Sequence, residues 1–160
     1  MFNNDMEVFV NMLLKYMHEY QIKNNIKSKC LNHTLFFVDA CNNKKKNYCK
    51  YEVGCVFYID NDNNLRAIVH CWCSINGKII EPSYEVSSIK YKKVYYNSIK
   101  DIFNNVDGID DKTKKWLIKQ ISWFNIQLLK CSKNKKYCTE GYNELQDFII
   151  NKFNSKIDVK

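Results

Sequence analysis

Apolar residues recur at helical spacing in both end thirds of the chain. Over residues 5–20 they return every three to four positions, which predicts an amphipathic helix. A second helix is predicted to begin near Ser28, and a third to run from a cap at Asp110 or Asp111 through Lys130. Residues 133–141 are predicted to form a loop before a final helix at 142–153. The buried face of the second helix is expected to carry Leu31, Leu35, Val38 and Cys41.

The middle of the chain has the pattern of a small antiparallel sheet. Residues 53–60, 66–75, 78–84 and 89–96 are rich in β-branched and aromatic residues, with polar turns between them. Helices followed by a strand meander and then by helices indicate an α+β fold. We therefore expect one domain over residues 1–160, with a core at 28–96 and a helical C-terminal extension at 110–155.

The two central strands are separated by Asn76-Gly77, a strong local signal for a two-residue hairpin. Both residues of such a type I′ turn need positive φ, which Asn and Gly tolerate best. The turn fixes the register of the strands, and the expected cross-strand pairs are Ile75 with Lys78, Cys73 with Ile80, and Trp72 with Glu81.

This register predicts that an imidazole and a carboxylate share one face of the hairpin. Side chains alternate along a strand, so His70 and Trp72 lie on the same face and Glu81 joins them there. His70 and Glu81 become diagonal neighbours, with Cα atoms roughly 7–8 Å apart. A histidine oriented by a carboxylate is half of a nucleophilic catalytic set.

Cys30 is the cysteine that best fits the role of a nucleophile. It follows a polar loop at the predicted start of a helix, and Lys29 adds a positive charge beside it. Thiolate is the reactive form, and a helix N-terminus lowers the pKa of a thiol. A cysteine followed along the chain by a histidine and a carboxylate is the order of papain-like hydrolases.

The ordered motifs resemble a family of small viral and bacterial proteins in the papain-like and transglutaminase-like cysteine hydrolase superfamily. Its pattern is Cys-x-Asn at a helix start, Tyr-x-x-Gly on a strand, His-x-Trp, a tight turn, and Asp-Pro followed by Thr or Ser. The resemblance spans residues 30–96, and its elements are Cys30-Leu31-Asn32, Tyr51-Glu52-Val53-Gly54, His70-Cys71-Trp72 and Glu81-Pro82-Ser83.

The resemblance implies a papain-like α+β fold and a cysteine peptidase, amidase or acyl transferase that works through a thioester. It makes Cys30 the nucleophile, His70 the general base and Glu81 the residue that orients His70. The backbone N–H of Cys30 would then help to hold the oxyanion. The sequence departs from the family in having Glu81 in place of Asp, and Cys71 where a small residue is usual.

Other residues near these motifs are expected to have structural roles. Trp72 is expected to line the site and exclude water from it. Asn32 is expected to form hydrogen bonds in the first helical turn. His33 is expected at the surface or behind the site, and no partner is visible in the sequence for His18, which lies on an amphipathic helix. The remaining cysteines are expected to pack as small apolar residues, among them Cys71 and Cys73, while Cys131 and Cys138 are candidates for a disulfide.

Charge and cysteine content limit the expected partners and compartment. The net charge of +8 favours an acidic peptide or protein substrate, and the only arginine is Arg66, which disfavours a dedicated nucleic-acid site. No apolar run has the length of a membrane span, and no secretory signal is visible, so we expect a cytoplasmic protein (host cytoplasm if viral) that does not bind membranes. No cofactor or metal is expected, because His70 and Cys71 point to opposite strand faces.

Two further functions remain open at the level of sequence. One is a catalytically inactive member of the same fold that binds a host or viral partner. The other is a basic nucleic-acid-binding module. Structural zinc held by histidine and cysteine is a third, less favoured use of the same residues.

Overall fold

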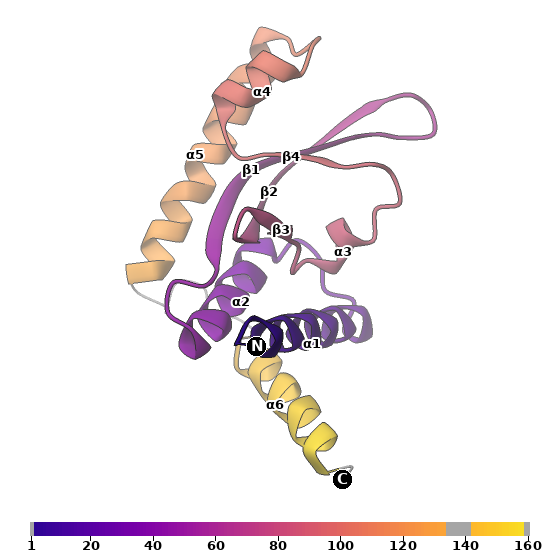
Figure 1. The fold of residues 1–160 in the computed structure, drawn as a ribbon. Helices are drawn as coiled ribbons and strands as arrows, with labels where there is room; N and C mark the ends of the chain where they lie inside the picture. Colours follow the sequence, from indigo (N-terminus) through magenta and orange to yellow (C-terminus); the bar gives the residue numbers. More distant parts are fainter. Residues whose placement is uncertain (1, 134–141, 159–160) are drawn as a thin grey trace.

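A computed structural model describes residues 2–133 and 142–158 of the chain (Figure 1). Within these ranges six helices and a four-stranded antiparallel sheet form an α+β fold, which confirms the predicted class. The helices are α1 (Phe2–Lys23), α2 (Cys30–Lys44), α3 (Tyr84–Ser87), α4 (Ile99–Asn105), α5 (Asp111–Lys133) and α6 (Tyr142–Asp158). The strands are β1 (Lys50–Ile59), β2 (Leu65–Ile75), β3 (Lys78–Ile80) and β4 (Val94–Tyr96).

The sheet has the order β3-β2-β1-β4 and lies between helices (Figure 1). One face packs on α5, where Leu117 and Ile121 meet Cys55 and Cys71. The other face packs on α3, where Val86 meets Val56 and Trp72. A third apolar cluster joins α1, α2 and α6, at the end of the molecule where both chain termini lie. No helix in the described part of the chain combines the length and apolarity that crossing a bilayer requires.

The hairpin forms as predicted near its turn and differs farther from it. Asn76 and Gly77 have φ of 51° and 77°, and the pairs Ile75–Lys78 and Cys73–Ile80 are present. The predicted Trp72–Glu81 pair is absent, because β3 ends at Ile80 and not at Tyr84. Pro82 has no N–H to continue the ladder, and the chain turns into α3.

Helix and strand boundaries also differ from the prediction in places. Helix α2 begins at Cys30 because Ser28 has a left-handed φ of 60°. The strand predicted over 89–96 shortens to β4, and α4 was not predicted although Ser98 accepts a hydrogen bond from the N–H of Asp101. Helix α5 begins as expected, with Asp110 accepting from the N–H of Thr113 at 2.7 Å. Nearly all of the predicted 133–141 loop lies outside the described residues.

Helix α2 covers an edge of β2 that β3 leaves open. Strand β3 pairs with β2 only over residues 73–75, so within the described residues the backbone of Cys71 has no strand beside it on that side. Thr34, one turn into α2, donates its hydroxyl to the carbonyl of Cys71 at 3.2 Å. Because Cys30 precedes Thr34 by four residues, it lies on the same helix face, against the same edge. This packing brings the start of α2 beside His70 and Cys71.

Replacing Gly54 by alanine is expected to destabilise the fold. Gly54 pairs with His70 across β1 and β2, and a Cβ there would lie 1.8 Å from the carbonyl oxygen of Tyr96. We expect the free energy of unfolding to fall by about 3 kcal/mol or more, at the upper end for overpacking. Gly77→Ala is the control, because only its φ of +77° opposes a side chain there and the cost is about 1 kcal/mol. Equal urea midpoints for the two variants would contradict this account.

Candidate active site

Cys30 is the first residue of α2 and is nearly buried, with 9% of its surface exposed. Lys29 at the N-cap position makes no capping hydrogen bond through its side chain. The start of a helix favours the thiolate form of a cysteine placed there.

Two residues of β2 hydrogen-bond to the sulfur of Cys30. The thiol of Cys71, the ring of His70 and the backbone N–H of Cys71 all donate to it. These donors outweigh the effect of burial, and they lower the pKa of Cys30 from 9.0 to about 5. The sulfur lies beside the open edge of β2, so side chains from both faces of the strand reach it. The arrangement favours a thiolate at neutral pH.

His70 is held between Cys30 and Glu81. Its Nε2 lies 2.9 Å from both carboxylate oxygens of Glu81, which leaves Nδ1 as the ring nitrogen for Cys30. Burial lowers the pKa of His70, but the hydrogen bonds to Cys30 and Glu81 raise it by more than burial lowers it. The resulting pKa is about 9, above the usual value of 6.5. Both partners are acceptors when ionised, and an imidazolium can donate to both. The geometry thus favours a thiolate–imidazolium pair backed by a carboxylate.

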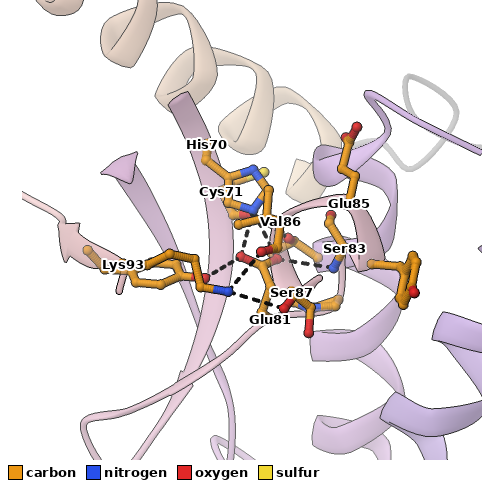
Figure 2. Close-up of polar contacts among 12 residues, drawn as sticks. His70, Cys71, Glu81, Ser83, Glu85, Val86, Ser87 and Lys93 are labelled. Atoms are coloured by element: carbon orange, nitrogen blue, oxygen red, sulfur yellow. Dashed lines mark hydrogen bonds and ion pairs between the residues drawn. The ribbon is translucent and has the colours of Figure 1, made fainter. Parts of the chain in front are cut away.

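Glu81 accepts hydrogen bonds from three residues (Figure 2). Besides His70, the N–H of Ser83 donates to Oε2 at 3.1 Å and the hydroxyl of Tyr95 donates to Oε1 at 2.8 Å. The carboxylate is 8% exposed and all its donors are fixed by the fold. The side chain of Glu81 therefore reaches the ring of His70 from the segment that follows β3.

Helix α1 anchors the segment that carries Glu81. The side-chain amide of Gln21 donates to the carbonyl of Pro82 at 2.7 Å and accepts from the N–H of Tyr84 at 2.8 Å. His18 hydrogen-bonds through Nε2 to the carbonyl of Glu81 at 2.9 Å. The sequence shows no partner for His18 because this one comes from a segment sixty-three residues away, which the helical pattern of α1 does not reveal.

Trp72 lies on the His70 side of β2, as predicted, but it is buried behind the site. Its ring stacks on His70 at 6.2 Å between centroids and meets Tyr95 edge-on at 4.9 Å. With 2% of its surface exposed, Trp72 faces the sheet core and not a substrate. Its contacts fix the orientations of both rings that bond to Glu81.

Asn32 and His33 border a cavity beside the first turn of α2. The cavity has a volume of about 210 Å³ and is also lined by Tyr20, Ile26, Lys29, Tyr142 and Leu145. His33 is buried rather than at the surface, and its burial lowers its pKa to about 4. The lining includes neither Cys30 nor His70, so the cavity flanks the reaction centre without containing it.

The cysteines divide into buried free thiols and a disulfide. Six are free and buried: Cys30, Cys41, Cys49, Cys55, Cys71 and Cys73. Cys131 is disulfide-bonded, while its predicted partner Cys138 lies outside the described residues. Cys71 packs in the core as predicted, and its thiol also interacts with the sulfur of Cys30. Among the described residues no three His, Cys, Asp or Glu are grouped to hold a metal ion.

Sequence reasoning found Cys30, His70 and Glu81, and the structure brings these three together. It missed Tyr95, Gln21 and the role of Cys71. Tyr95 lay in a predicted strand and Gln21 just after the helix predicted over 5–20, but nothing local pointed Tyr95 at Glu81 or Gln21 at the segment that follows it. Comparison of the chain with protein-family models, curated proteins and solved structures found no match.

Proposed function

We propose that this protein is a cysteine-dependent acyl-transfer enzyme of the papain-like or transglutaminase-like kind, acting on amide or ester bonds. The observation that carries the proposal is the continuous chain of contacts from the Cys30 sulfur through His70 to Glu81. A nucleophile, a base and an orienting carboxylate in hydrogen-bond contact form the minimal set for covalent catalysis.

The reaction would begin from the thiolate–imidazolium pair. The sulfur of Cys30 attacks the carbonyl carbon and forms a tetrahedral oxyanion. His70 donates its proton to the departing amine or alcohol, leaving a thioester on Cys30. His70 then removes a proton from water, or from an acceptor amine, as that group releases the acyl product. Glu81 keeps the ring in place and stabilises its positive charge during each step.

The start of α2 supplies the oxyanion site in this scheme. The backbone N–H of Cys30 lies at the positive end of the helix, where a developing negative charge is stabilised. The amide of Gln21 holds the Pro82–Tyr84 segment, donating one N–H to the carbonyl of Pro82 and accepting from the N–H of Tyr84, so its position is set by the segment that follows Glu81.

The net charge of +8 supports an acidic peptide or protein as substrate. Arg66, the only arginine, is held by Asp60 at 2.7 Å, which weakens the nucleic-acid-binding alternative. The six free thiols support a reducing compartment such as the cytoplasm, although the disulfide at Cys131 does not. The burial of Cys30 supports the second candidate, a catalytically silent binding protein of the same fold.

Acetylation by p-nitrophenyl acetate tests the proposal. At neutral pH we expect a burst of one p-nitrophenolate per chain and an added acetyl group on Cys30, located by peptide mass spectrometry. The acetyl group should leave faster when glycinamide is added as an amine acceptor. Cys30→Ala should abolish the burst, whereas Cys55→Ala should retain it, because burial raises the pKa of Cys55 to about 12. Acetylation spread over several cysteines would point to the silent protein instead.

A further inference from the structure

The acyl-transfer mechanism makes no use of the Cys71 thiol, although it touches the nucleophile. Cys71 is fully buried on the α5 side of β2 and donates a hydrogen bond from its sulfur to that of Cys30. Both residues are free thiols in this structure. A second thiol in contact with a reactive thiolate is the arrangement in which a disulfide forms after oxidation.

The contact between the two sulfurs is fixed by backbone on both sides. The N–H of Cys71 donates to the sulfur of Cys30, and the carbonyl of Cys71 accepts from Thr34 one helical turn later. Helix α2 is thereby tied to the edge of β2 at two successive turns. Cys30 and Cys71 also belong to one buried apolar cluster, so the packing of α2 on β2 places the two side chains in the same part of the core.

We propose that Cys30 and Cys71 are a redox-active pair that a hydroperoxide oxidises to a reversible disulfide. The inference rests on the proposed function only in sharing Cys30 as the reactive sulfur. Its consequence is that the disulfide occupies the nucleophile, so oxidation stops acyl transfer and a thiol reductant restores it.

The chemistry takes two steps with hydrogen peroxide as the oxidant. The Cys30 thiolate attacks one peroxide oxygen, an S–O bond forms, the O–O bond breaks, and the departing hydroxide takes a proton from His70 to become water. Cys71 then attacks the sulfur of the resulting sulfenic acid. An S–S bond forms, the S–O bond breaks, and the hydroxide leaves as a second water with the Cys71 proton. Two thiols are oxidised and one peroxide is reduced.

The other free thiols provide internal comparisons. Cys55 is fully buried, and burial raises its pKa to about 12, so it should oxidise slowly. Cys49 is the main rival, because hydrogen bonds from the thiols of Cys41 and Cys73 lower its pKa to about 4, but only 3% of its surface is exposed. Cys30 is also the most exposed of the six, which favours its attack on a peroxide in solution.

Peptide mapping of the full chain after hydrogen peroxide treatment tests the pair. Remaining thiols are blocked with iodoacetamide before digestion without reductant. We expect a peptide linking Cys30 to Cys71, a parallel loss of p-nitrophenyl acetate burst, and recovery of both by dithiothreitol. We expect Cys30 to oxidise at least about 10-fold faster than Cys55, as its thiolate character predicts. A disulfide among Cys41, Cys49 and Cys73 without one at Cys30 would overturn the proposal.

Cys71→Ser removes the resolving thiol while keeping a donor of similar shape. In this variant we expect oxidation of Cys30 to pass to sulfinic and sulfonic acids that dithiothreitol does not reverse. Cys55→Ser should behave as wild type. Acetylation of Cys30 without any Cys30–Cys71 disulfide would defeat the redox pair and leave the acyl-transfer function standing. A Cys30–Cys71 disulfide without acetylation of Cys30 would support the redox pair and defeat the acyl-transfer function.

Discussion

Replacing His70 by alanine is expected to reduce the acetylation rate of Cys30 at neutral pH by about 10²–10⁴-fold, the usual contribution of a positioned acid–base group. The variant loses both the proton carrier and the cation beside the thiolate. The pKa of Cys30 should rise from about 5 toward 9.0, although the donors of Cys71 remain. Thiolate absorbance near the ultraviolet edge, followed against pH, measures this shift independently of any substrate.

His33→Ala is the matched control for this variant. His33 is also buried in the first turns of α2, but it makes no hydrogen bond to Cys30. We expect its acetylation rate to remain within about 3-fold of wild type, as for a change away from the reacting atoms. If both variants lose activity equally, the effect of His70→Ala comes from damage to the fold.

The acetylation rate of the wild-type protein should follow a bell-shaped profile against pH. Its two limbs belong to the coupled pair of Cys30 and His70. The lower limb, near pH 5, follows deprotonation of Cys30, and the upper limb, near pH 9, follows deprotonation of His70. The pKa of Cys30 is depressed by folding, so its stabilising contribution is lost as pH falls through about 5. The pKa of His70 is raised, so its contribution is lost as pH rises through about 9.

Replacing Glu81 by alanine is expected to lower the free energy of unfolding by about 3–5 kcal/mol, the cost of breaking a buried ion pair. The variant leaves His70, the N–H of Ser83 and the hydroxyl of Tyr95 without their acceptor. It should also lower the pKa of His70 from about 9 and move the upper limb of the profile to lower pH. Urea unfolding and the acetylation profile measure the two effects.

Two further variants separate the role of the charge from that of packing. Glu81→Gln keeps an acceptor oxygen and the size of the side chain but loses the charge, so it should move the pH limb with a smaller loss of stability. Glu85→Ala removes a nearby carboxylate that accepts only the N–H of Ser28, at 2.7 Å, and should cost about 1 kcal/mol. A Glu81→Ala protein as stable as Glu85→Ala would contradict the buried network.

Local sequence patterns accounted for much of the framework. The turn at Asn76-Gly77 set the register of β2 and β3, because both residues tolerate positive φ. The long periodic segments gave α1, α5 and α6. Predictions were poorer where two short-range tendencies competed, as at Pro82, where an apolar strand pattern ended in a chain reversal into α3.

The sequence by itself determined the α+β class, the long helices and the hairpin turn, and it singled out Cys30, His70 and Glu81, since turn chemistry, helical periodicity and motif spacing are local properties. Only the tertiary structure decided that α2 covers the open edge of β2, and hence that His70 and Cys71, on opposite faces of one strand, both reach the Cys30 sulfur. It also decided the partners of Glu81 from Ser83 and Tyr95. Such contacts depend on packing between distant segments, which no local pattern encodes.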